Sequence, residues 1–287
     1  VVRSIISLLK HDTQIKGFEL EKNLTLNFIK TTSMIESLDK LPLLHHLMRL
    51  CPLPELQFEK LFVAMRRVLL VNLDKVEPSP QLVNFLSTIS LHCFVNEYVY
   101  AESDEESFLV EELQETITKV VAQSDLPEVT KILCLASYRP LHQYDWCQKL
   151  RSLDGLKEVK KRLIEEPLLE KIIAKHIPVL AEVSDDVSLK VRDQYEENPY
   201  PRWVKLSAAV KAKPAAEVFD KLKLNIHSKK IKNVSAPRIL IAGCGTGQHS
   251  IETASRFLNC HVTAVDLSLA SLAYAERKSK ELRFTQY

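Results

Sequence analysis

The sequence predicts an α + α/β protein, with an all-helical domain over residues 1–184 and a parallel α/β unit over residues 237–287. Two observations support this prediction. No glycine occurs between Gly17 and Gly155, and apolar residues recur in that region at helical spacing. In contrast, three of the five glycines lie between Gly243 and Gly247, directly after an apolar, β-branched run. We therefore expect a helical domain first and a strand, glycine turn, helix and strand last.

The helical prediction rests on three apolar stripes that each repeat at the spacing of one buried helix face. They are formed by Phe58, Leu61, Phe62, Met65 and Leu69; by Leu82, Phe85, Leu86, Ile89 and Cys93; and by Val129, Ile132, Leu133 and Ala136. Prolines lie near the expected helix starts, where a first-turn proline is tolerated, at Pro42, Pro54, Pro80 and Pro127. The stripes start at uneven intervals and the tetratricopeptide signature is absent, so the sequence does not predict a regular repeat.

Charged residues are unevenly distributed although the net charge is only +2. Eight lysines lie between Lys205 and Lys232, where Glu217 and Asp220 are the only acidic residues. This stretch could form a patch for an anionic acceptor or nucleic acid. We favour a solvated helix and linker that joins the two domains, because Phe219 is the only Phe, Trp or Tyr among these lysines. Residues 185–236 are thus predicted to be an aromatic, proline-rich segment followed by a basic linker. The acidic run at residues 102–106 is predicted to be a solvated loop.

The glycine-rich turn carries the most specific functional signal in the chain. It reads Gly-Cys-Gly-Thr-Gly over residues 243–247, and a predicted helix follows it. Glycine permits positive φ and close approach of a ligand, and the helix start points backbone N–H groups at that ligand. The next predicted strand ends at Asp266, whose carboxylate can accept hydrogen bonds from ribose hydroxyls. This arrangement predicts a nucleotide-type ligand.

The spacing of the glycines separates the candidate ligands. A dinucleotide fingerprint requires G-x-G-x-x-G, and Gln248 stands where its third glycine should be. Asp266 disfavours a 2′-phosphate, and no triphosphate-binding G-x-x-x-x-G-K-[ST] motif exists in the chain. NAD and a glycine turn without any ligand remain as alternatives.

The pattern G-x-G-x-G followed by a strand-ending acid resembles the class I S-adenosylmethionine-dependent methyltransferases. Residues 238–247 match their first motif and residues 264–268 match the second, whereas Ile241 stands where many members carry Asp or Glu. The resemblance implies a Rossmann-like domain, S-adenosyl-L-methionine as cofactor, and no metal. The cofactor-binding residues that it implies are Ala242, Gly243, Cys244, Gly245, Thr246, Gly247, Asp266 and Leu267.

The segment before the glycine turn is also distinctive, because residues 195–203 contain three aromatic residues and two prolines. The prolines exclude a regular helix there. In similar methyltransferases, segments before the first strand often cover the cofactor, so Tyr200, Arg202 and Trp203 are candidate lid residues. The alternative is an aromatic plug that joins the linker to the core.

The resemblance implies methyl transfer to an unidentified acceptor, for which a small molecule or a protein is favoured over nucleic acid. Residues 41–106 are similar to helical segments that precede this domain in bacterial proteins, some with tetratricopeptide repeats upstream, which suggests a protein partner. The alternative is a helical interaction scaffold with a vestigial nucleotide motif. We expect the chain to be truncated after the second strand and helix, with a third strand beginning near Arg283. Its catalytic residues should then lie beyond Tyr287, and this segment alone should be inactive.

Composition predicts a cytoplasmic protein without a membrane span, because charged residues interrupt every long apolar run. The six cysteines contain no C-x-x-C pair and fall mostly in apolar segments, which favours reduced, buried thiols.

Overall fold

The computed structural model describes residues 28–75, 77–152, 156–181, 184–206 and 211–283. The chain divides into two units, Val1–Pro167 and Leu168–Tyr287, and the division falls inside helix α10 (Glu166–Ala174). The predicted fold class is confirmed, because a helical region precedes a small parallel sheet. The predicted domain boundaries after residues 184 and 236 stay predictions.

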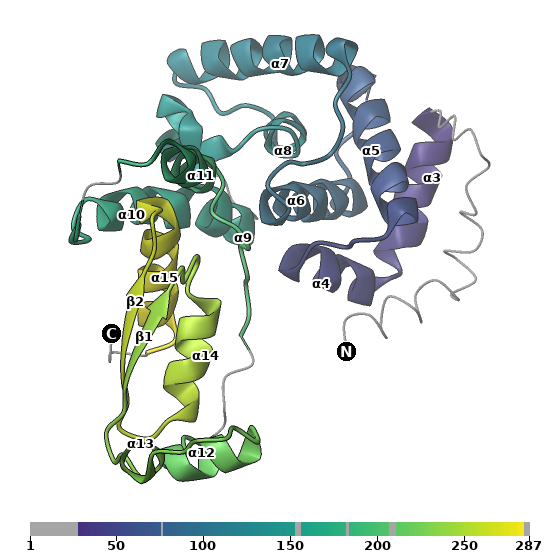
Figure 1. Ribbon diagram of the computed structural model, residues 1–287. Helices are drawn as coiled ribbons and strands as arrows, with labels where there is room; N and C mark the ends of the chain where they lie inside the picture. The colour runs from purple at the N-terminus through teal and green to yellow at the C-terminus, as the bar shows by residue number, and fades with distance from the viewer. Residues whose placement is uncertain (1–27, 76, 153–155, 182–183, 207–210, 284–287) are drawn as a thin grey trace. The chain divides into compact units, whose positions relative to one another are not determined.

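The N-terminal unit is helical throughout its described part (Figure 1). Its helices are α3 (Phe28–Asp39), α4 (Pro42–Leu50), α5 (Leu56–Val71), α6 (Pro80–Val95), α7 (Asp104–Ala122), α8 (Val129–Ala136) and α9 (Lys157–Lys160). A π-helical turn, Lys161–Glu165, joins α9 to α10. Pro42 and Pro80 are the first residues of α4 and α6, as the sequence predicts.

Helix α6 forms the centre of the N-terminal unit and packs against α3, α4, α8 and α9. Ser79 caps its N-terminus by accepting a hydrogen bond from the Leu82 N–H at 3.2 Å. The predicted stripe from Leu82 to Cys93 is buried, but so are polar residues between its members, because α6 is surrounded on several sides. Each such polar group must find a partner inside the protein.

His92 is a fully buried titratable group of α6. Its Nδ1 lies 2.9 Å from the Met48 carbonyl oxygen and its Nε2 lies 2.7 Å from the Tyr100 hydroxyl. The edge of Phe62 packs against the imidazole ring. Burial lowers the pKa of His92 to about 4, from an ordinary value of 6.5. The imidazole is therefore neutral in the folded protein at neutral pH.

We expect the N-terminal unit to lose stability as the pH falls from 6.5 towards 4. In this window the unfolded chain binds a proton at His92 and the folded chain does not, so acid favours unfolding. The loss from this residue should reach about 3 kcal/mol at pH 4. Urea unfolding followed by circular dichroism at several pH values measures it. His92→Gln should flatten the pH dependence, and an identical slope in both proteins would contradict the assignment.

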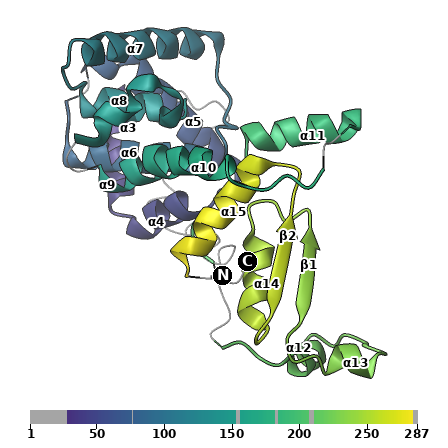
Figure 2. The same cartoon turned by 90° about the vertical axis from the view of Figure 1, so that its left-hand side faces the viewer.

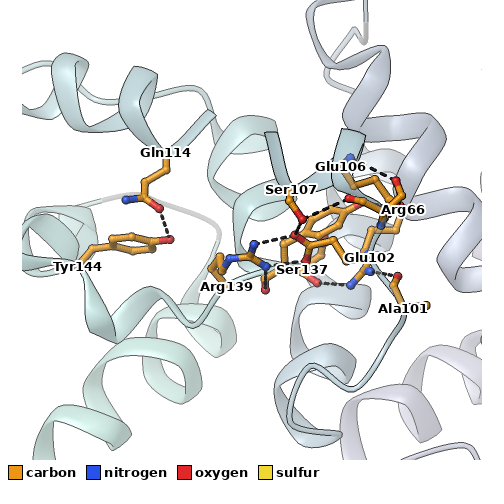
Figure 3. Close-up of polar contacts among 11 residues, drawn as sticks. Arg66, Ala101, Glu102, Glu106, Ser107, Gln114, Ser137, Arg139 and Tyr144 are labelled. Atoms are coloured by element: carbon orange, nitrogen blue, oxygen red, sulfur yellow. Dashed lines mark hydrogen bonds and ion pairs between the residues drawn. The ribbon is translucent and has the colours of Figure 1, made fainter. Parts of the chain in front are cut away.

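A second buried polar cluster joins α5, α7 and the residues after α8 (Figure 3). The Arg66 guanidinium donates to the Ser137 carbonyl at 3.0 Å and to the Ala101 carbonyl at 2.9 Å, and it lies 3.9 Å from the Tyr138 ring centroid. The Tyr138 hydroxyl donates to Glu106 Oε1 at 2.8 Å. This network replaces water around a charge that is only 3 % exposed.

The prediction of a solvated loop for the acidic run at residues 102–106 is wrong. Glu106 is buried in the first turn of α7 and forms a reciprocal capping box with Ser103. Glu102 accepts two hydrogen bonds of 2.7 Å from Arg139, which lower the pKa of the Glu102 carboxyl (Figure 3). The run therefore starts a helix, and Glu102 and Glu106 bind half-buried or buried partners.

The C-terminal unit contains a two-stranded parallel sheet with helices beside it (Figures 1 and 2). After α10 its elements are α11 (Asp186–Glu197), α12 (Ala215–Lys221), α13 (Lys229–Lys232), β1 (Arg238–Ala242), α14 (Gln248–Arg256), β2 (His261–Val265) and α15 (Leu269–Glu281). The register pairs Arg238 with His261 and Ala242 with Val265. The two strands therefore end together at one edge, which is where ligands of such sheets bind.

One face of this sheet carries the core of the unit. Ile241 and Val262 are buried there with Cys244 and Cys260, and Phe257 packs against them. Every second side chain of each strand points to the opposite face, where Leu240 is 67 % exposed. The predicted third strand begins near Arg283, and residues 284–287 lie outside the described residues.

Three further observations on the described residues concern membrane-spanning helices, metal sites and disulfides. None of the helices that the structure describes is both long and apolar enough to cross a membrane. In the same residues, no group of three or more His, Cys, Asp or Glu side chains is arranged to bind a metal ion. None of the six cysteines, all of which lie in the described residues, forms a disulfide; five are buried and Cys51 is half-buried.

Candidate functional site

The turn that follows β1 has the conformation that its three glycines predict. Gly243, Gly245 and Gly247 have φ values of 70°, 51° and 78°, which other residues rarely adopt. The N–H groups of Gly243 and Cys244 both donate to the Val265 carbonyl, at 2.9 and 3.1 Å. The predicted tight turn between a strand and a helix is therefore confirmed, and it is fixed to the end of β2.

Gly247 is required for a second reason, the close approach of α15. A Cβ atom at this position would lie 2.4 Å from the Cβ and 3.1 Å from the Cα of Ala275. At Gly243, by contrast, a Cβ would meet nothing within 4 Å. The third glycine therefore permits helix packing, and the first leaves open space beside the backbone.

Asp266 lies at the same sheet edge as the glycine turn. Its Oδ2 accepts a hydrogen bond from the Gly245 N–H at 2.7 Å, and its Oδ1 accepts one from the Ser268 N–H at 3.0 Å. The prediction that Asp266 ends the adjacent parallel strand beside the turn is confirmed. A carboxylate has about four lone-pair sites, so each oxygen retains capacity for a further donor.

The predicted site residues differ in exposure. Ala242, Gly243 and Leu267 are exposed, and Gly245 and Asp266 are half-buried. The other three predicted residues are buried within the turn; they are Cys244, Thr246 and Gly247.

Cys244 is a buried thiol inside the turn. Its Sγ lies 3.6 Å from the Gly245 carbonyl oxygen. Burial, and then the nearby Asp266 carboxylate, raise the pKa of the Cys244 thiol to about 11. This sulfur is therefore protonated at neutral pH.

The aromatic and proline-rich segment contacts the glycine turn directly. The Trp203 indole Nε1 donates to the Thr246 carbonyl at 3.0 Å, and the Thr246 hydroxyl donates to the Pro201 carbonyl at 2.8 Å. Tyr274 of α15 packs edge-on against Trp203 and donates its hydroxyl to the Trp203 carbonyl. These contacts hold the segment against the turn and against α15.

The three candidate lid residues have different surroundings. Arg202 and Trp203 are 8 % and 7 % exposed, whereas Tyr200 is 51 % exposed. Arg202 lies 3.7 Å from Glu170 of α10, and the same carboxylate accepts a 2.7 Å hydrogen bond from Arg277 of α15. Arg202 thus lies beside α10, Trp203 packs against Ile251 of α14 and Tyr274 of α15, and Tyr200 is the one of the three with an exposed side chain. The lid and the aromatic plug both stay predictions.

The starts of the two helices at this edge are capped differently. Helix α15 begins after Ser268, whose hydroxyl accepts the Ser271 N–H at 3.0 Å. Helix α14 begins after Gly247, and in the described structure no side chain caps it. Its first backbone N–H groups are therefore available at the glycine turn.

Sequence reasoning did not single out Ser268 and Glu196 as residues of this region. Ser268 has a local signal, since a serine before an apolar helix is a typical cap. Glu196 contacts the first turn of α15 from 73 residues away. No spacing rule links residues at that separation.

The lysines predicted to form a linker lie on and around α12 and α13. Lys213 pairs with Glu217 at 2.9 Å and Lys232 pairs with Asp220 at 2.7 Å. The Lys213 backbone also bonds to the end of α14, through Arg256 and Leu258 at 2.8 Å each. The stretch is thus joined to the sheet unit and is largely exposed to solvent.

Comparison with known proteins agrees with this geometry. Residues 239–286 match a family model described as a methyltransferase domain. The match includes the glycine turn, Asp266 and the described part of α15. No curated protein and no solved structure matched the chain.

These findings support a class I methyltransferase domain over residues 239–286, with the two-stranded parallel sheet at its start and a helical region before it. The resemblance predicted from the two sequence motifs is therefore confirmed for residues 239–286.

Proposed function

We propose that this domain binds S-adenosyl-L-methionine between the glycine turn and Asp266 and transfers its methyl group to an acceptor. The observation that carries the proposal is the 2.7 Å contact between the Gly245 N–H and the Asp266 carboxylate. It joins the loops after β1 and β2 at the edge where ligands of parallel sheets bind. The match to a methyltransferase domain supports the same function.

The residues present fit this cofactor. The free lone pairs of Asp266 would accept hydrogen bonds from the ribose hydroxyls, as the resemblance implies. The open space at Gly243 would admit the ligand close to the backbone. Leu267 is 43 % exposed and offers an apolar surface beside Asp266. Ala242 completes the exposed rim of the site.

The helix starts favour this cofactor over NAD. A dinucleotide places its pyrophosphate on the helix start of a G-x-G-x-x-G turn, and Gln248 stands at the position of the third glycine here. At α15 the first N–H groups are already bound by Ser268 and Glu196. The uncapped start of α14 remains for the polar groups of a smaller ligand.

Methyl transfer requires little acid–base chemistry from this chain. When the cofactor is bound, its sulfonium supplies an activated methyl group. The turn and Asp266 would fix the position of the methyl group, and Tyr200 would cover it and exclude water. We propose a small molecule or a protein as acceptor, because Phe219 is the only Phe, Trp or Tyr among the lysines of residues 205–232. A protein partner for the helical unit and a cytoplasmic location stay predictions.

Replacing Asp266 tests the proposed cofactor site. We expect Asp266→Ala to weaken S-adenosylmethionine binding by about 1.5–3 kcal/mol, because charge-assisted hydrogen bonds to the cofactor are lost. Isothermal titration calorimetry on the intact protein measures the affinity. Asp220→Ala, which removes an exposed carboxylate from α12, is the control and should bind as wild type does.

The outcomes separate the alternatives. Equal affinity in wild type and Asp266→Ala would remove Asp266 from the site. Failure of wild type to bind the cofactor would favour a helical scaffold with a vestigial motif.

A further inference from the structure

Glu196, near the end of α11, binds the first turn of the helix that follows Asp266. Its carboxylate accepts hydrogen bonds from the Leu269 N–H and from the Ala270 N–H, the latter at 3.2 Å from Oε2. Ser268 donates its hydroxyl to the Tyr195 carbonyl at 3.0 Å. The end of α11 therefore holds the start of α15 through both a side chain and the backbone.

These contacts lead directly to Asp266. The Ser268 N–H donates to Asp266 Oδ1, and the other carboxylate oxygen accepts the Gly245 N–H. Glu196 thus fixes Leu269 and Ala270, the two residues that follow Ser268. A displacement of the α15 start would move Ser268 and, with it, the Asp266 carboxylate.

The same stretch of chain also holds the other loop. A few residues after Glu196, Pro201 accepts the Thr246 hydroxyl and Trp203 donates to the Thr246 carbonyl in the glycine turn. The segment from α11 to Trp203 therefore connects the loop after β1 with the loop after β2. Neither connection is part of the sheet, so these contacts hold the two loops in addition to the hydrogen bonds from Gly243 and Cys244 to Val265.

The geometry assigns Glu196 a positioning function, as opposed to catalysis. Both of its oxygens are engaged by backbone N–H groups of α15, so neither is directed at a reacting group. A carboxylate at a helix start is also stabilised by the helix dipole, which favours this fixed arrangement.

We propose that Glu196 is a positioning residue for cofactor binding, which holds the start of α15 so that Asp266 meets the ribose. This inference rests on the proposed function and extends it to a residue outside both sequence motifs. Misplacement of a binding group by a fraction of an ångström is costly, so loss of Glu196 should weaken cofactor affinity by about tenfold or more.

The test compares Glu196→Ala, Glu196→Gln and Asp185→Ala in the intact protein. Asp185 is a matched control, because its carboxylate caps the opposite end of the same helix by accepting the Ser188 N–H at 2.8 Å. Affinity for S-adenosylmethionine is measured by calorimetry and the melting temperature by circular dichroism. We expect Glu196→Ala to bind about tenfold more weakly and Asp185→Ala to bind as wild type.

Glu196→Gln retains one carbonyl oxygen as acceptor and should show an intermediate affinity at a melting temperature near that of wild type. It decides the question if Glu196→Ala fails to fold. A double variant with Asp266→Ala should lose less affinity than the two single variants added together, because both act through one contact network.

Wild-type affinity in both Glu196 variants would overturn this proposal alone. So would an equal loss of affinity in Asp185→Ala, because weakening α11 would then be sufficient. Absence of binding in wild type would overturn the proposed function and this proposal with it.

Discussion

Gly247→Ala should lower the free energy of unfolding of the C-terminal unit by about 2–5 kcal/mol. Two costs combine at this position. Alanine disfavours the φ of 78°, and its Cβ would lie 2.4 Å from the Cβ of Ala275. Because the neighbouring atoms belong to α15, the helix must move away from the glycine turn. Chemical denaturation measures the stability, and cofactor affinity should fall with it.

Gly243→Ala is the matched control, since it has a similar φ of 70° and meets nothing within 4 Å. It should cost only the backbone term, about 1–2 kcal/mol. Combining Gly247→Ala with Ala275→Gly should restore part of the stability, because the closest atom is then removed. Equal losses for the two alanine variants, with no rescue by Ala275→Gly, would contradict the steric explanation.

Arg66→Ala should lower the free energy of unfolding of the N-terminal unit by about 3–5 kcal/mol. The variant loses two hydrogen bonds from a buried charge, at 3.0 and 2.9 Å, and the stacking of the guanidinium on Tyr138. The carbonyls of Ala101 and Ser137 then lose a donor in the protein interior. Denaturant unfolding followed by circular dichroism measures the change.

The adjacent Arg67 provides the control for this prediction. Its guanidinium pairs with Glu105 at 2.6 Å, but its side chain is 50 % exposed. Exposed ion pairs of this kind contribute little to stability, so Arg67→Ala should be nearly neutral. Similar losses in the two variants would show that burial of the Arg66 network is not what stabilises the unit.

The parts of the molecule that the sequence predicted correctly depend on local patterns. The glycine turn follows a β-branched strand, and Asp266 ends the next strand, so residues close in sequence define that edge. The helix starts at Pro42 and Pro80 were also predictable from local sequence, because a first-turn proline needs no partner elsewhere in the chain.

The features that the sequence did not predict depend on distant partners. Glu106 belongs to an acidic run, and only the Tyr138 hydroxyl, 32 residues later, explains why it is buried. Arg202 belongs to a segment whose composition predicted a lid, but its partner Glu170 lies on α10. A charged residue in a single sequence gives no sign of such a partner, so its burial could not be predicted.

The raised pKa of Cys244 determines the reactivity of the glycine turn. At pH 7 a thiol with a pKa of about 11 is ionised in only about one molecule in ten thousand. A methyl donor is an electrophile, and an ionised cysteine within the turn would compete with the acceptor for the methyl group. In the proposed cofactor site, burial and the negative charge of Asp266 would therefore suppress alkylation of Cys244. The same carboxylate that is proposed to bind the cofactor therefore also keeps the neighbouring sulfur inert.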